Sequence, residues 1–172
     1  MPVLTFEITL PAPIDRVWQF HEDVPAALPA LSPPESGVKV ESADLPARVG
    51  SRIVITARGP LGLRIRWVAK ITAHRPPRAG GAYGAEFADE QESGPFAAWL
   101  HEHVFEEVGP CATRVTDRVT YRVPLGPLGV VADHLFVRRR LVAMFRHRHR
   151  ALARVFGQGL APAAAPPVQS PA

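Results

Sequence analysis

Apolar and polar residues alternate along residues 3–10, which is the pattern of a strand with one buried face. Pro11 ends this pattern. Pro13 then stands where a helix can begin without losing a backbone donor, and apolar residues at helical spacing predict a short helix over 13–21. A second helical segment is predicted at 24–31, before the break at Ser32-Pro33-Pro34.

The middle of the chain repeats strand-like segments that Gly and Pro separate, and no helical pattern intervenes. Short connections of this kind favour antiparallel hairpins over a parallel sheet, so the strands are expected to form a meander. With the first strand they make seven. The six later strands are predicted at about 37–42, 51–58, 62–74, 80–91, 96–108 and 112–123.

The periodicity becomes helical over residues 128–156, which predicts one long amphipathic helix. Gly157 is a candidate stop signal. Residues 158–172 are rich in Pro and Ala and lack apolar periodicity, so they are expected to form a disordered tail beside a single domain at 1–157. The apolar arc of the helix is expected to contain Val131, Leu135, Val142, Phe145, Leu152 and Phe156.

These elements predict an α+β fold in which one face of a curved, seven-stranded antiparallel sheet is buried against the C-terminal helix. Two short helices follow the first strand. A strongly curved sheet wraps such a helix, and a cavity is expected between them.

Composition agrees with one globular domain. The chain has 172 residues, of which 47% are hydrophobic and 21% charged, as in average globular proteins. The single Cys111 excludes an internal disulfide and a multi-cysteine metal site. No apolar run approaches 18 residues and no secretory leader pattern is present, so a cytoplasmic protein is the expectation.

Positive charge is concentrated in the predicted C-terminal helix. The net charge is +4, and seven arginines lie between residues 138 and 154. Such a cluster can bind nucleic acid or an anionic membrane. Most of these arginines fall on the arc opposite the core, however, and no aromatic residues are interleaved for base stacking. We therefore expect no nucleic-acid partner and no stable membrane insertion.

Candidate chemistry lies on the inward faces of two adjacent strands. In the segment 96–108, alternation places Trp99, His101, His103 and Phe105 on one face. Asp117 belongs to the apolar face of the next strand. Three hairpin registers satisfy these faces, and they place His101, His103 or Phe105 opposite Asp117.

A buried carboxylate needs donors, and four residues are candidates to reach Asp117: His101, His103, Arg138 and Arg148. The arrangement is compatible with a structural hydrogen-bond network, a polar hook for a ligand, or general acid/base catalysis. The His-x-His spacing with Asp117 also resembles a metal-ligand pattern, but no third histidine is fixed nearby, so no metal is predicted. No nucleotide or cofactor motif is present either, and no cofactor is expected.

Two further strands contribute inward aromatic residues. Trp67 shares a face with Ile65 and Ala69, and Phe87 shares a face with Tyr83, Asp89 and Gln91. Asp89 or Gln91 is expected near the mouth of a cavity.

Several short stretches resemble the START-like superfamily of helix-grip proteins, which includes the birch pollen allergen and polyketide cyclases. More narrowly, the chain looks like the bacterial ligand-binding SRPBCC proteins, over residues 3–156. The matching stretches are Ala12-Pro13, Val17-Trp18, Leu31-Ser32-Pro33, Phe87 to Gln91, Gly94-Pro95-Phe96, Trp99 to Phe105, Thr113, Asp117, Val119, Tyr121, Pro124 and Gly126, with Leu141, Phe145, Arg148 and Leu152 in the final helix.

The resemblance implies a monomer or homodimer that binds a small hydrophobic molecule of lipid, polyketide or aromatic type between sheet and helix. The alternative is a cyclase, dehydrase or hydrolase that uses Asp117 with His101 or His103 as acid and base. The candidate ligand-binding residues are Trp67, Phe87, Gln91, Trp99, His101, His103, Phe105, Asp117, Tyr121, Arg138, Phe145 and Arg148.

Overall fold

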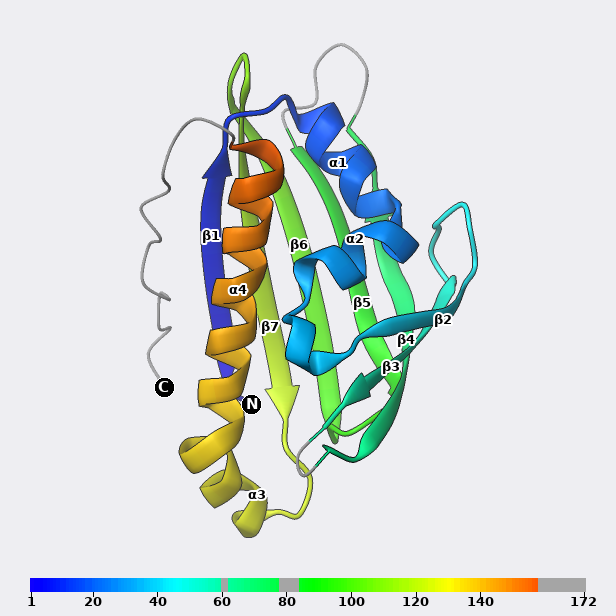
Figure 1. Cartoon of the computed structure of the whole chain (residues 1–172), viewed down its shortest axis with the longest axis vertical. Helices are drawn as coiled ribbons and strands as arrows, with labels where there is room; N and C mark the ends of the chain where they lie inside the picture. Colours follow the sequence, from blue (N-terminus) through cyan, green and yellow to red (C-terminus); the bar gives the residue numbers. More distant parts are fainter. Residues whose placement is uncertain (60–61, 78–83, 158–172) are drawn as a thin grey trace.

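A computed structural model of the protein describes residues 1–59, 62–77 and 84–157. Its seven strands form one antiparallel sheet in the order β1-β7-β6-β5-β4-β3-β2, which confirms the predicted α+β fold and meander (Figure 1). The strands are β1 (Val3–Leu10), β2 (Lys39–Ala43), β3 (Arg52–Arg58), β4 (Arg64–Arg75), β5 (Gly84–Ser93), β6 (Ala98–Gly109) and β7 (Ala112–Arg122).

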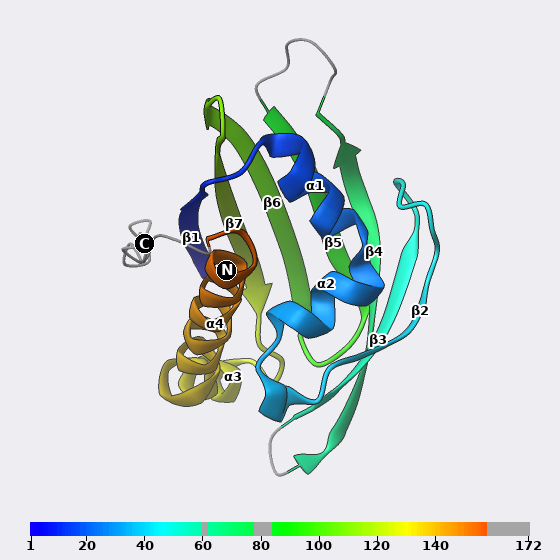
Figure 2. The same ribbon diagram turned by 45° about the horizontal axis from the view of Figure 1, so that its top comes forward.

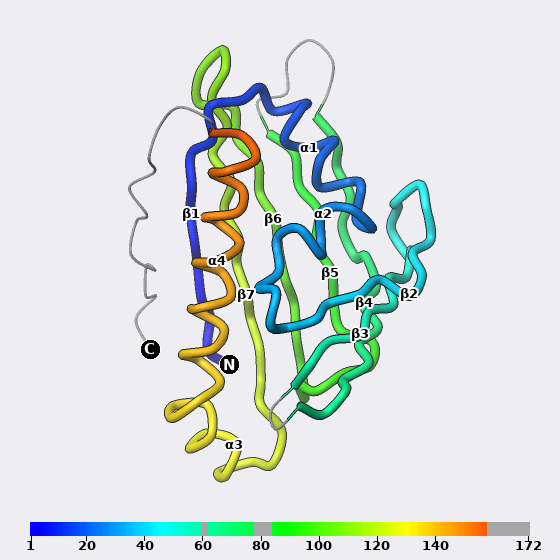
Figure 3. The backbone as a smooth tube through the Cα atoms, in the orientation of Figure 1, coloured from blue at the N-terminus to red at the C-terminus, as the bar shows by residue number. Residues whose placement is uncertain are grey.

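Helices α1 (Ile14–Glu22), α2 (Val24–Leu31) and α4 (Arg138–Phe156) lie on one face of this sheet (Figures 1 and 2). The long helix α4 runs beside β1 and β7, while α1 and α2 cross the part of the sheet nearer β5 and β4. Figure 3 shows the chain turning back after α2 and passing through η1 before it enters β2 at the far edge. The other helical segments are the 3₁₀ turn η1 (Pro34–Ser36), α3 (Pro127–Ala132) and the π-helical turn η3 (Asp133–Val137).

The predicted helix over 128–156 is interrupted, because residues 133–137 form a π-helical turn. Such a turn takes about one residue more than an α-helical turn, so the face of the helix changes there. Val131 and Leu135, which were expected in the buried arc, are therefore 55% and 51% exposed. The predicted buried apolar face is present only within α4, where Leu141, Phe145 and Leu152 are buried.

Two apolar clusters lie between the sheet and the helices. One contains Trp18, Phe105 and Leu152, and the other contains Phe6 and Phe145. Polar residues lie between them, because positions 101, 103, 117 and 149 fall between members of the two clusters along β6, β7 and α4. The core thus carries a band of titratable side chains across its middle.

Some predictions fall outside the described ranges. These are the tail at 158–172 and the strand start at 80–83, which includes Tyr83. No helix within the described ranges is long and apolar enough to cross a membrane.

Candidate functional site

A cavity of about 840 Å³ lies between the sheet and the helices. Strands β3 to β6 supply its floor, α2 and η1 one wall, and α4 the other. Its surface is mainly apolar and aromatic, with Trp67, Phe87, Trp99 and Phe145 as the largest rings.

Seven of the candidate ligand-binding residues line this cavity. They are Trp67, Phe87, Trp99, His101, His103, Phe145 and Arg148. The other five do not line it, and each has an identifiable role elsewhere. They are Gln91, Phe105, Asp117, Tyr121 and Arg138.

Gln91 closes the turn between β5 and β6, since its side chain donates to the Phe96 carbonyl at 2.7 Å and accepts from the Phe96 backbone N–H at 3.2 Å. Phe105 is fully buried and packs edge-on against Trp18. Their side chains therefore shape the fold around the cavity rather than its surface.

Tyr121 and Arg138 lie at the end of the core near the π-helical turn. The Tyr121 hydroxyl donates to Asp133 Oδ1 at 2.8 Å. Burial, with this hydrogen bond, raises the pKa of Tyr121, while the charge of Arg138 acts in the opposite direction. The hydrogen bond between Tyr121 and Asp133 connects β7 to the start of the C-terminal helical region.

Asp117 is the centre of the polar band. The hairpin of β6 and β7 places His103 opposite Asp117, one of the three registers that alternation permits. Its Oδ1 lies 3.1 Å from His101 Nε2 and 2.8 Å from His103 Nδ1, and its Oδ2 lies 2.9 Å from His149 Nε2. The contact with His103 is close but poorly aligned for a hydrogen bond. Three imidazoles thus surround one carboxylate that is only 1% exposed.

The surroundings keep Asp117 ionised. Burial alone would raise the pKa of Asp117, but the close contact with His103 and the hydrogen bonds from His101 and His149 hold it well below its usual value. Burial and the neighbouring His101 lower the pKa of His103 well below 6.5, which Asp117 only partly offsets. We therefore describe His103 as a neutral imidazole beside a carboxylate ion.

An ionised carboxylate presents only lone pairs, which would repel the lone pair of an unprotonated nitrogen at these distances, so the imidazole nitrogens that face Asp117 carry the hydrogens. In neutral rings, the remaining nitrogens are then unprotonated. For His101 this nitrogen is Nδ1, and for His103 it is Nε2. Asp117 consequently sets the tautomers of both cavity-lining histidines.

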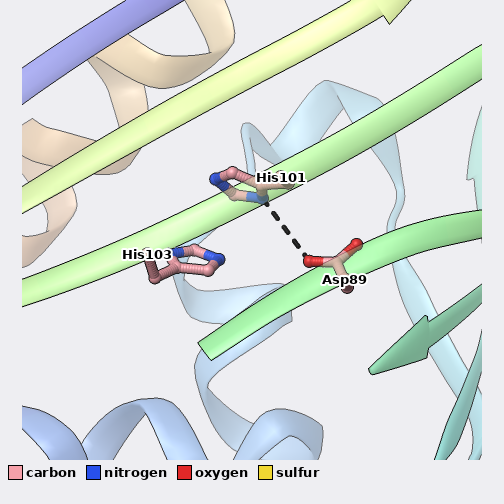
Figure 4. A group of neighbouring side chains, drawn as sticks. All are labelled: Asp89, His101 and His103. Atoms are coloured by element: carbon pink, nitrogen blue, oxygen red, sulfur yellow. Dashed lines mark ion pairs between the residues drawn. The ribbon is translucent and has the colours of Figure 1, made fainter. Parts of the chain in front are cut away.

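Asp89 extends the group to the cavity surface. Its Oδ2 lies 3.7 Å from His101 Nδ1, and Figure 4 shows a ring nitrogen of His103 turned toward the same carboxylate. The Asp89 side chain is 17% exposed, and within the described ranges its carboxylate has no hydrogen bond. Burial raises the pKa of Asp89, although His101 and Arg148 oppose the shift.

Two further histidines of the site were not among the predicted site residues. His149 lies on the buried face of α4, and a helix pattern does not show which strand residue faces it. His21 lies on the buried face of α1, its Nδ1 donates to the Val17 carbonyl at 2.7 Å, and its Nε2 is buried without a partner in the described part of the chain.

His21 makes stability depend on pH. Burial lowers the pKa of His21 to about 4, so the unfolded state binds a proton more readily below pH 6.5. The neutral ring contributes its full stability above pH 6.5 and loses it as pH falls toward 4. The charged or titratable groups that act on this ring are Arg148, Asp117, His101 and His103.

Between pH 7 and pH 4, the free energy of unfolding of the wild-type protein is expected to fall by about 3 kcal/mol more than that of the His21→Phe variant. Urea unfolding of both proteins across this pH range measures the difference. Phenylalanine keeps the ring shape without the titration. Parallel pH profiles of the two proteins would contradict this assignment.

A comparison with protein-family models identifies the class of protein to which this site belongs. Residues 10–150 match the family described as polyketide cyclase/dehydrase and lipid transport. The chain belongs to this family. A comparison with curated proteins found no match.

Several solved structures share the fold. A START superfamily protein from Mycobacterium smegmatis is 15% identical, with a TM-score of 0.65 over 92% of this chain and 99% of that chain. A protein from Thermus thermophilus is 21% identical, with a TM-score of 0.61 over 90% and 99%. A norcoclaurine synthase mutant from Thalictrum flavum, in complex with a transition-state analogue, is 16% identical, with a TM-score of 0.58 over 89% and 94%.

This member of the polyketide cyclase/dehydrase and lipid transport family has the helix-grip fold that the sequence predicted. The cavity and the Asp117 cluster lie where sheet and α4 face each other, within the residues that the family match covers.

Proposed function

We propose that this protein binds one small hydrophobic molecule, of lipid, polyketide or aromatic type, in the cavity between sheet and α4. The observation that carries the proposal is the cavity itself. Its volume of about 840 Å³ lies within the range of small-molecule sites, and a few polar groups interrupt an apolar, aromatic lining.

Arg148 favours a ligand with an acidic or hydrogen-bond-accepting head. Its Nε is a buried donor without a partner among the described residues, and the side chain lines the cavity. His21 Nε2, also buried in the lining without a partner there, is an acceptor in the neutral ring and suits a hydroxyl group of the ligand. Buried polar atoms normally have a partner, so a ligand atom is the natural one here. At the rim, the exposed Arg58, Arg140 and Arg150 outnumber the exposed Glu35, which adds attraction for an anion.

Titration with 1-anilinonaphthalene-8-sulfonate tests this proposal, because the probe combines aromatic rings with an anionic group. We expect saturable binding at one probe per chain, and an approximately tenfold weaker affinity for Arg148→Gln, since one charge-assisted hydrogen bond contributes about 1.5 kcal/mol or more. Arg154→Gln removes an exposed arginine outside the cavity lining and serves as the control. Unsaturable binding, or equal losses in both variants, would count against a ligand head at Arg148.

A second candidate function is acid/base catalysis of the cyclase, dehydrase or hydrolase kind. The observation that favours it is the position of His101, which lies between the cavity-facing Asp89 and the fully buried Asp117. An imidazole held between two carboxylates can accept a proton from a ligand, and the buried carboxylate then stabilises the imidazolium that forms. Among proteins of similar fold, the norcoclaurine synthase and a di-domain ARO/CYC protein carry names of enzymes.

Catalysis is tested with a panel of aryl esters and β-keto thioesters, with products detected by mass spectrometry. Turnover that disappears in His101→Gln, while affinity for the naphthalene probe is retained, would support a catalytic residue. A panel that yields no turnover above buffer would reject this second function and leave the binding proposal intact.

A further inference from the structure

We propose that Asp89, His101 and His103 form a binding site for a divalent transition-metal ion at the inner end of the cavity. This site goes beyond binding of an organic molecule, because a metal ion can bind there while the rest of the cavity is empty. It rests on three convergent side chains and on the buried carboxylate behind them (Figure 4).

The pairing of β5 with β6 brings Asp89 beside the two histidines as a third ligand, which the sequence pattern alone did not identify. Asp89 pairs with His101 across these strands, and His103 follows on the same face. One ligand atom from each of Asp89, His101 and His103 lies within 4.8 Å of the other two. Donors of a tetrahedral zinc site are about 3.3 Å apart, so coordination requires these groups to draw closer by at most about 1.5 Å.

Asp117 prepares both histidines as ligands. It faces His101 Nε2 and His103 Nδ1, so the opposite nitrogens, His101 Nδ1 and His103 Nε2, present lone pairs toward Asp89. Metal-binding histidines characteristically have a carboxylate or carbonyl on the other ring nitrogen, which fixes the tautomer and ring orientation. Here one carboxylate serves both rings.

Three electron-pair donors that face one another repel unless a proton or a cation lies among them. The Asp89 carboxylate has no hydrogen bond within the described part of the chain, and it lies only 3.7 Å from His101 Nδ1. A bound divalent cation would satisfy all three donors together and offset the burial of the Asp89 charge. A cation can therefore take the place of a proton among these residues and hold them as a ligand set.

The donor set indicates which ions fit. Two imidazole nitrogens and one carboxylate suit Zn²⁺, Fe²⁺ or Co²⁺ better than Mg²⁺ or Ca²⁺, which prefer oxygen ligands. Three protein ligands leave at least one coordination position open. Because all three residues line the cavity, that position faces the space in which an organic ligand would lie.

Isothermal titration of tag-free, chelator-treated protein with Zn²⁺ tests the site, with Co²⁺ absorption as a second measurement. We expect one equivalent to bind, with the visible absorption of Co²⁺ bound to nitrogen and oxygen ligands. Asp89→Asn and His103→Gln should each weaken binding by about 100-fold or more, because loss of even an outer-shell partner costs 10- to 100-fold. Circular dichroism should show both variants folded.

His74→Gln is the matched control, since His74 pairs with Glu22 outside the proposed site and should leave the affinity unchanged. Absence of binding, or binding that survives both Asp89→Asn and His103→Gln, would overturn the proposal. Binding lost in His74→Gln would also overturn it, because the ion would then lie elsewhere. None of these outcomes depends on whether an organic ligand binds.

Discussion

Replacing Asp117 with asparagine is expected to lower the free energy of unfolding by about 3 to 5 kcal/mol, the usual cost of removing one partner from a buried charged cluster. Three imidazoles approach the two carboxylate oxygens within 3.1 Å. The amide has the same shape, but its NH₂ group would face an imidazole N–H that now lacks an acceptor. Thermal unfolding should show a decrease in Tm of roughly 6 to 20 °C for a domain of this size.

Asp89→Asn is the matched control for this substitution. Asp89 belongs to the same group of side chains, but it has no hydrogen bond within the described residues, and burial raises its pKa. Removing that charge is expected to change stability by less than about 1 kcal/mol. Equal losses for the two variants would show that Asp117 is not the centre of the network.

Phe145→Ala is expected to cost about 3 to 5 kcal/mol of stability, as large-to-small changes in well-packed cores do. Phe145 is fully buried on α4, and its ring stacks on Phe6 of β1 with centroids 4.7 Å apart and planes at 7°. It also packs edge-on against His101. Truncation would leave a hole between helix and sheet beside the polar cluster.

Chemical denaturation of Phe145→Ala and Phe136→Ala measures this effect against a control of the same chemistry. Phe136 lies in the π-helical turn and is 65% exposed, so its truncation should change stability by no more than about 0.5 kcal/mol. Similar costs for the two variants would mean that α4 does not hold the sheet through Phe145.

Alternation and helical spacing predicted the strands, the two short helices and the inward faces well, because burial on one face controls both periodicities. The interruption at 133–137 was not predictable in this way. A π-helical turn changes the direction in which the side chains point but leaves no mark in the residue types. Val131 and Leu135 therefore fit the apolar pattern of the sequence although their side chains are exposed.

The sequence predicted which residues belong to the candidate site better than it predicted which of them contact one another. Alternation turned His101, His103 and Asp117 inward, but the register depends on the β6–β7 turn and on an irregularity between Glu107 and Gly109. That choice placed His103 opposite Asp117. No local pattern could assign His149 to the same carboxylate, since the docking of α4 on the sheet is a long-range property.

The location of the polar band also bears on function. Burying Asp117 with His101, His103 and His149 costs desolvation energy that an apolar core would avoid. The band separates two apolar clusters and reaches the cavity through the two histidines of β6. This position is compatible with a role in holding a ligand head, moving a proton or binding a metal ion, each of which has its own test above.

The central claim is that one small hydrophobic molecule occupies the cavity between sheet and α4. Native mass spectrometry of the purified protein, beside Ala69→Trp, tests it most directly, because Ala69 is a buried residue of the cavity floor and the indole would fill space there. Leu128→Trp adds the same side chain at a position that is 73% exposed and outside the lining. The account predicts one adduct per chain on the wild type and Leu128→Trp, and loss of that adduct from Ala69→Trp. No adduct after incubation with lipid and polyketide-type extracts, or equal adducts on all three proteins, would contradict it.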